Sequence, residues 1–205
     1  GNQAATVVRV VSVIDPAASA TKTSVLTSIV DTIVVPNYKL LSESAEDFAG
    51  IDGPLSTYCD SIGTSSENEM HLAAQEAWLT LMRHVQKAEL GNFGPGAKNN
   101  QALRNNINFH FDDQQLSTCA TDVAVVRAND DSSYDVSVTT GNQRSIAATE
   151  YLLFNDDLNH TCASNVSSVS AWNELPDLDR KQQRCHLNKL IASDVAANAN
   201  QIHTD

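Results

Sequence analysis

The fold is decided by one stretch, Glu67–Leu90, which reads ENEMHLAAQEAWLTLMRHVQKAEL. Its apolar residues recur three and four positions apart, the spacing that places side chains on one face of an α-helix. Ser65 and Ser66 can cap its first turn, and the two glutamates in that turn suit the positive end of the helix dipole. Gly91 ends the stretch, which therefore predicts a long amphipathic helix followed by the tight loop GNFGPG. The apolar stripe consists of Met70, Ala73, Ala74, Ala77, Trp78, Leu81, Val85 and Ala88.

On the N-terminal side, a first helix is predicted to begin at Thr23 or Ser24, because either residue can cap it. Pro36 has no backbone N–H, so it should kink this helix or restart it. The local excess of valine and isoleucine leaves a β-strand as the alternative. The glycines and the proline of Ala49–Pro54 predict a turn there.

On the C-terminal side, three stretches predict helices: Leu116–Ala128, Gln143–Phe154 and Asp177–Ile202. The weakly alternating residues 133–140, SYDVSVTT, fit a short strand or a loop. Residues 155–177 read as a long polar linker. The sequence contains no fixed-period repeat and no Gly/Ser-rich linker between domains. The pattern as a whole predicts an all-α protein, an up-and-down helical bundle.

Length and charge set the class of partner. The chain has 205 residues and a formal net charge of −12 at pH 7. Such an acidic chain repels phosphate backbones, so we expect no nucleic-acid partner, whereas cationic partners such as metal ions are compatible with it. No run of eighteen apolar residues occurs, so no transmembrane segment is predicted. We expect a helical domain over residues 23–205, preceded by an N-terminal tail or tether of residues 1–22.

The first residues point to a membrane anchor. Gly1-Asn2-Gln3 is similar to the small polar start that follows a lipidated cysteine in bacterial lipoproteins. We therefore expect a lipid anchor just before Gly1, with the tail serving as a tether that needs little structure. A tag remnant or an ordinary cleavage site is the alternative.

The four cysteines, Cys59, Cys119, Cys162 and Cys185, are widely spaced, and none belongs to a CxxC pair. An even number of scattered cysteines suits two disulfides in an oxidising compartment, and four buried thiols are the alternative. Spacing alone does not choose among the three possible connectivities. We predict Cys59–Cys119, which would pin the turn after the first helix, and Cys162–Cys185, which would close a loop over the polar linker.

One carboxylate stands in an apolar setting. Glu150 lies within Arg144–Asp157, RSIAATEYLLFNDD, a predicted helix that is apolar on most sides. The carboxylate is therefore either exposed at the rim of the helix or buried with a partner, because an unpaired buried charge is too costly. A buried Glu150 would need Arg83, Arg104 or a metal ion as its partner.

A metal site in a helical bundle uses carboxylates and imidazoles that project inward from facing helices. Glu76 and His84 are eight residues apart and can share a face of the Glu67–Leu90 helix, so we name them with Glu150 as candidate ligands for iron or zinc. Glu89 is five residues from His84 and shares its face poorly, so it is grouped with Arg83 and Arg104 as a possible partner at the helix seam. A solvated polar face is the alternative. No P-loop, GxGxxG, GxSxG or HExxH motif is present.

Several stretches resemble the imelysin-like proteins, also classed as the M75 peptidases. The resemblance spans about Ser24 to Ile202. The stretches that carry it, in order, are SIVDTIVVPNYKLLSESAEDF, AAQEAWLTLMRHVQKAELGNFGPG, RNNINFHFDD, and EYLLFNDD followed by RCHLNKLIASDVAANANQI.

The resemblance implies an all-helical fold of two bundle-like halves, of which this chain would be an incomplete copy, truncated at its C-terminal end. It implies a location outside the cytoplasm, in the periplasm or at the cell surface, and a link to bacterial iron uptake. The family's GxHxxE motif, aligned on Glu150, places its glycine on Ser145 and its histidine on Ala147. Loss of that histidine weakens metallopeptidase chemistry, because catalytic zinc usually needs three protein ligands.

Three functions follow as expectations. The first is an extracytoplasmic imelysin-like protein of iron uptake that binds a metal ion or an iron-bearing ligand. The second is an M75-type metallopeptidase. The third is an interaction module without a working site.

Overall fold

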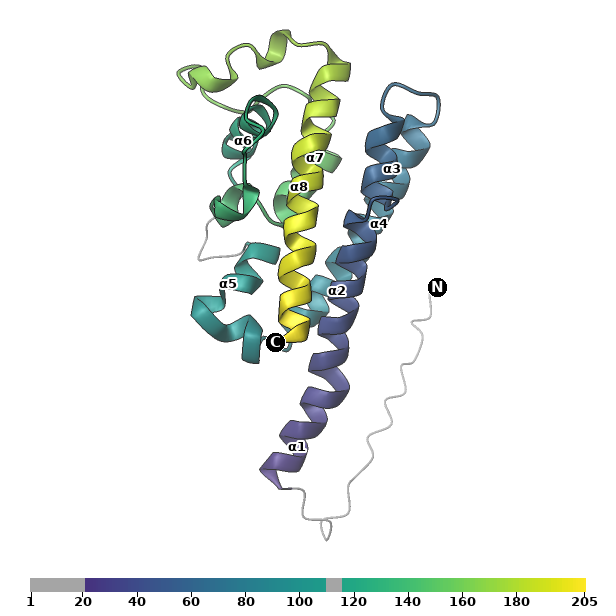
Figure 1. Ribbon diagram of the computed structural model, residues 1–205, viewed down its shortest axis with the longest axis vertical. Helices are drawn as coiled ribbons and strands as arrows, with labels where there is room; N and C mark the ends of the chain where they lie inside the picture. Colours follow the sequence, from purple (N-terminus) through teal and green to yellow (C-terminus); the bar gives the residue numbers. More distant parts are fainter. Residues whose placement is uncertain (1–20, 110–115) are drawn as a thin grey trace, which may run out of the picture.

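The computed structural model describes residues 21–109 and 116–205, and within these ranges it contains helices and loops but no β-strand. The predicted all-α fold is confirmed, and the helices pack side by side along one long axis (Figure 1). The predicted tail lies almost wholly outside the described residues. The longer helices are α1 Lys22–Ile29, α2 Val35–Ala49, α3 Pro54–Ser61, α4 Glu67–Glu89, α5 Lys98–Ile107, α6 Thr118–Asp130, α7 Ile146–Phe154 and α8 Asp177–Thr204.

The first rod of the bundle is continuous from α1 through a π-helical turn, Val30–Val34, into α2 (Figure 1). Thr21 caps its start, since its side chain accepts a hydrogen bond from the Ser24 N–H. Pro36 lies in the first turn of α2, where a missing N–H is tolerated. The rod runs on through Pro36, so the expected interruption of the helix is limited to the π-helical turn just before it, and the strand alternative is wrong here.

Helix α4 has nearly the predicted bounds. Its inner face packs on α2, α3 and α7. Trp78 is buried there and donates a hydrogen bond from Nε1 to the Ile146 carbonyl oxygen at 3.2 Å. The ring of Phe154 meets Trp78 edge-on, with centroids 5.1 Å apart. These contacts fix α7 against the middle of α4.

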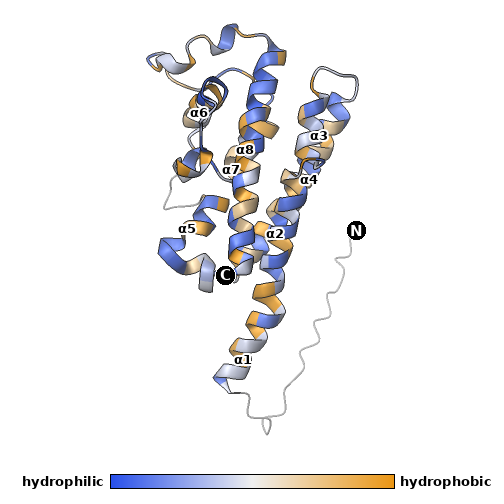
Figure 2. Cartoon of the chain, in the orientation of Figure 1, coloured by the Kyte–Doolittle hydropathy of each residue, from blue (hydrophilic) through white to orange (hydrophobic). Residues whose placement is uncertain are grey.

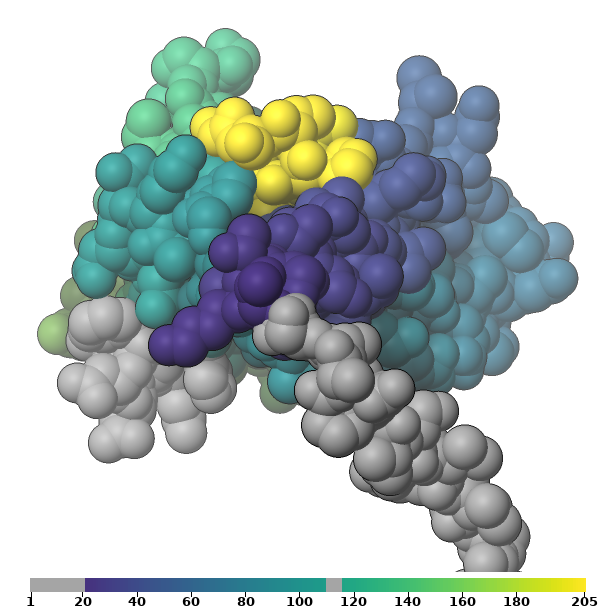
Figure 3. Space-filling view, turned by 90° about the horizontal axis from the view of Figure 1, so that it is seen from below, coloured from purple at the N-terminus to yellow at the C-terminus, as the bar shows by residue number. Residues whose placement is uncertain are grey.

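Helix α8 is the central element. It contacts α2, α5, α6 and α7, and in the end-on view its C-terminal end lies between α2 and α5 (Figure 3). Leu187, Ile191, Val195 and Ala199 recur at intervals of four residues and are fully or almost fully buried. Because α8 packs against both halves of the chain, four of its polar residues are also buried: Arg180, Arg184, Asn188 and Asn198.

Two short helices, α3 and α5, lie in segments where no helix was predicted. Helix α5 is interrupted near its start, since Asn99, Asn100 and Gln101 all have positive φ angles. Residues 133–140, predicted as strand or loop, contain a 3₁₀ turn at Val136–Val138. Asp135 caps this turn by accepting a hydrogen bond from the Ser137 N–H.

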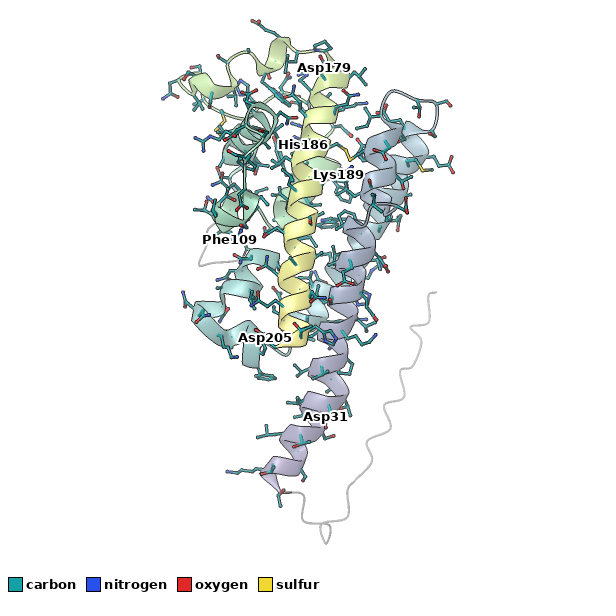
Figure 4. The ribbon with its side chains drawn as sticks, in the orientation of Figure 1. Asp31, Phe109, Asp179, His186, Lys189 and Asp205 are labelled. Atoms are coloured by element: carbon teal, nitrogen blue, oxygen red, sulfur yellow. A yellow bond between two sulfur atoms is a disulfide. The ribbon has the colours of Figure 1, made fainter. Side chains whose placement is uncertain are left out.

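Two disulfides are present, but the predicted pairing is wrong. Cys59 is bonded to Cys185, with Cα atoms 5.7 Å apart, and Cys119 is bonded to Cys162, with Cα atoms 4.6 Å apart (Figure 4). The reason is that α3 packs against the first half of α8, which brings together two cysteines far apart in sequence. The 155–176 linker in turn folds back over α6.

Most apolar side chains face the interior, but the free end of the first rod keeps an apolar surface (Figure 2). Leu26, Ile29 and Ile33 are exposed there. Among the helices of the described ranges, none is both long enough and apolar enough to cross a membrane.

Candidate functional site

A cleft of about 490 Å³ opens between the α3–α4 pair and the α7–α8 pair. We call it the α4–α8 cleft. Helical spacing builds it, because Lys181, Arg184 and Asn188 follow one face of α8 at intervals of three and four residues. On the opposite side, Glu67 and His71 are one turn apart on α4. Two helix faces that carry polar residues thus line a cavity within an otherwise apolar bundle.

One wall of the cleft is aromatic. The rings of Tyr58 and His71 are stacked, with centroids 4.6 Å apart and planes 23° apart. His71 Nε2 lies 2.7 Å from the Leu153 carbonyl oxygen, so this nitrogen carries a proton and donates it. Burial, with the negative charge of Glu67 as a second cause, raises the pKa of Tyr58 to about 12. The two rings are therefore held in place, and Tyr58 stays uncharged at neutral pH.

An ion pair bridges the rim. Lys181 Nζ of α8 donates a hydrogen bond to the carboxylate of Glu67, in the first turn of α4. The Gly63 N–H also donates to Glu67, at 2.8 Å. The hydrogen bond from Lys181, followed by that from Gly63, lowers the pKa of Glu67. The two sides of the cleft are thus tied at its mouth by a charge-assisted contact.

The floor of the cleft holds a buried cation. The side chain of Arg184 is only 3% exposed, and its guanidinium lies over the Tyr151 ring, 5.5 Å from the centroid. Nη1 donates to the Asn155 carbonyl oxygen at 3.2 Å. Within the described ranges, Arg184 Nε and Nη2 have no hydrogen-bond partner, and neither has Oδ1 of Asn188. Buried polar atoms are normally paired, so these atoms mark the floor as a candidate binding site.

Asp122 of α6 supplies the balancing charge behind Arg184. Its carboxylate lies 3.8 Å from Arg184 Nη2, beyond hydrogen-bond distance. It accepts hydrogen bonds from the Tyr151 hydroxyl at 3.0 Å and from the Thr161 N–H at 2.8 Å. Asp122 is therefore satisfied mainly by other donors, and the donors of Arg184 are not used up by it.

The predicted metal ligands lie outside this cleft. Glu150 and Glu76 are exposed, and His84 is half-buried. No group of three or more His, Cys, Asp or Glu side chains that could hold a metal ion occurs in residues 21–109 and 116–205, so these three do not form one. The buried alternative for Glu150 is corrected to the exposed one, because its side of α7 faces solvent.

The predicted seam partners are also arranged differently. Arg104 of α5 forms an ion pair with Glu89 of α4 at 3.2 Å, instead of reaching Glu150. Glu89 also accepts a hydrogen bond from Asn108 at 2.8 Å. Arg83, the first predicted partner of Glu150, is exposed. These contacts fasten α5 to the end of α4.

Sequence reasoning missed Arg184 and Asn188. A signal was present, because Arg184 lies three residues before Leu187 and Asn188 three residues before Ile191, which places both on the same buried face of α8. Polar residues in line with a buried apolar stripe indicate a polar pocket or a buried network.

Fold and cleft together define a class: an all-α, disulfide-bonded protein with a polar cleft between helices. Comparison with family models gives no match to this chain. Searches of curated proteins and of solved structures give no significant match either.

Proposed function

We propose that this protein is an extracytoplasmic binding protein that takes a small ligand into the α4–α8 cleft. The observation that carries the proposal is the buried, incompletely hydrogen-bonded pair Arg184 and Asn188 at the floor of a cleft of about 490 Å³. Cavities of this size suit small molecules, and polar groups that converge on one point, such as this guanidinium and amide, fix the orientation of the ligand in such sites.

The compartment is argued from the disulfides. Two disulfides among the described residues, Cys59–Cys185 and Cys119–Cys162, are compatible with an oxidising location outside the cytoplasm. Within that class we propose the periplasm or the cell surface, with a lipid anchor before Gly1. The codon preceding Gly1 tests the anchor, because a lipidated protein requires cysteine there.

The link to iron uptake remains a proposal that rests on the resemblance to the imelysin-like proteins. One structural detail supports that resemblance. Ser145, at the position of the motif's glycine, has a φ of 93° and a ψ of 169°, a conformation that glycine adopts far more readily than serine. In this setting the ligand of the cleft would be an iron-bearing chelate, since Arg184 and Lys181 offer donors to the chelating anion.

The experiment measures iron retained by the purified protein after equilibration with ferric citrate and desalting. We expect stoichiometric iron with the native chain and loss of it with Asn68→Trp, which fills the cleft from α4. Gln86→Trp, an exposed site on the same helix outside the cleft lining, is the matched control. Retention by Asn68→Trp equal to that of the control would contradict the cleft as the site.

Two other functions remain as alternatives. Iron or zinc salts retained without a chelator, together with chelator-sensitive peptide cleavage, would favour an M75-type metallopeptidase. Failure to retain either chelate or metal would favour an interaction module without a working site.

A further inference from the structure

Arg184 has hydrogen-bond donors to spare. A guanidinium carries five N–H donors in a planar fork. The hydrogen bond to the Asn155 carbonyl oxygen uses one of them, and Nε and Nη2 have no hydrogen-bond partner in the described part of the chain. Asp122 balances the charge from 3.8 Å without making a hydrogen bond. A buried cation with open donor positions is costly unless something else completes them.

The shape of the guanidinium indicates what completes it. Adjacent N–H groups of arginine match the two oxygens of a carboxylate, and such paired, charge-assisted hydrogen bonds are among the strongest in proteins. Asn188 lies one turn from Arg184, and rotating its amide presents Nδ2, a donor, in place of the unpartnered Oδ1. Lys181, at the rim, is paired with Glu67, so the positive charge available to a ligand at the floor is that of Arg184.

The walls of the α4–α8 cleft indicate what kind of molecule bears the carboxylate. Tyr58 and His71 form a stacked, flat surface, and Leu152 and Leu153 add apolar area. We infer that the α4–α8 cleft recognises a small organic carboxylate, with its carboxylate on Arg184 and its apolar body against the Tyr58–His71 stack. This inference rests on the proposed binding function and names the class of its ligand.

Access requires a small movement. Arg184 lines the cleft, but its Nε and Nη2 have almost no accessible area of their own. A carboxylate therefore reaches them only when neighbouring side chains move aside. Binding should accordingly change the environment of residues on both α4 and α8.

The test compares benzoate with benzamide, which has the same shape but no charge. Both are titrated into the full, isotope-labelled chain and followed by backbone amide NMR. We expect saturable shifts at the cleft residues of α4 and α8, and benzoate affinity at least about tenfold higher than that of benzamide, because a charge-assisted pair is lost with the amide. Equal affinities, shifts that map elsewhere, or no saturable binding of benzoate would overturn the inference.

A variant pair assigns the effect to Arg184. Arg184→Gln should reduce benzoate affinity to the level of benzamide. Lys189→Gln, which removes an exposed positive charge from the same helix, should leave it unchanged (Figure 4). If Arg184→Gln does not fold, the comparison of benzoate with benzamide in the native chain still decides the matter.

Failure of this inference differs from failure of the proposed function. Binding of benzamide in the cleft with an affinity equal to that of benzoate would overturn the carboxylate inference and leave the proposed binding function standing. If inorganic phosphate displaces benzoate when its concentration is lower than that of benzoate, the site is a phosphate site and the carboxylate inference is wrong. If no probe binds in the cleft, ferric citrate included, both the carboxylate inference and the proposed binding function are wrong.

Discussion

Arg184 Nη2 and Asp122 Oδ1 lie 3.8 Å apart, between side chains that are 3% and 1% exposed. Removing one member of a buried pair strands the other charge, at a cost of about 3–5 kcal/mol. Asp122→Ala should therefore lower the free energy of unfolding by about that amount in a denaturant melt. Asp130→Ala, at an exposed position on the same helix, should change it by less than about 0.5 kcal/mol. Equal effects of the two changes would show that the buried pair contributes nothing.

The disulfides differ in the length of chain that they close. Cys59–Cys185 has a sequence separation of 126 and Cys119–Cys162 one of 43. The chain-entropy relation gives about 5 and about 4 kcal/mol of stabilisation, respectively. Replacing the first pair by alanine should therefore cost about 1 kcal/mol more than replacing the second, as measured by denaturant unfolding.

The connectivity itself is checked by a peptide map of the unreduced protein. The map should yield cross-linked fragments containing Cys59 with Cys185 and Cys119 with Cys162. A fragment joining Cys59 to Cys119 would contradict the packing of α3 against α8.

The Glu67–Lys181 ion pair makes stability depend on acidity. Hydrogen bonds from Lys181 and Gly63 lower the pKa of Glu67 below its ordinary value of 4.5. The stabilisation is therefore complete above about pH 4.5 and is lost as the pH falls through the lowered pKa of the folded state. Glu67→Gln should flatten the fall of the melting temperature below pH 4.5, whereas Glu69→Gln, at an exposed position in the same first turn of α4 but outside the cleft lining, should not. Parallel acid profiles for Glu67→Gln and the native chain would refute this.

Glu150 is exposed on α7, so it should be tolerant of change. Glu150→Ala should alter the free energy of unfolding by less than about 0.5 kcal/mol, with or without added iron or zinc. A larger loss that occurs only in metal-loaded protein would restore Glu150 as a metal ligand, since an ion stabilises the state that binds it.

Glu150 and Arg184 show that the sequence predicts the helices but not which polar side chains are buried. The α4 and α8 helices were predicted because a period of 3.6 is a local property of the chain. Local sequence also singled out Glu150 as a candidate site residue, because the residues around it are mostly apolar. Burial, however, depends on which face of α7 meets α4 and α8, and the sequence does not state that. Arg184 was missed for the converse reason, because its immediate neighbours in sequence are polar although its helix is central.

The cysteine pairing has the same origin. The prediction paired consecutive cysteines, Cys59 with Cys119 and Cys162 with Cys185, the second because it would close a loop over the polar linker. The true pairing follows from the side-by-side packing of α3 and α8, a contact between distant segments. Short helices such as α3, which depend on tertiary contacts more than on their own propensity, escape prediction for this reason as well.

The Cys119–Cys162 disulfide lies within the loop that Cys59–Cys185 closes. If the chain is pulled from its two ends, tension passes from α3 directly through the sulfur bridge into α8. The segment of chain between those cysteines, which are 126 positions apart, carries no load. This segment includes α4, α6, α7 and the inner disulfide. Among the described residues, the rod of α1 and α2, the start of α3 and the part of α8 after Cys185 can be drawn out. The cleft residues between the two cysteines, which include Glu67, His71 and Arg184, are shielded from stretching by covalent chemistry alone, whereas Tyr58 and Asn188 lie just outside the closed loop.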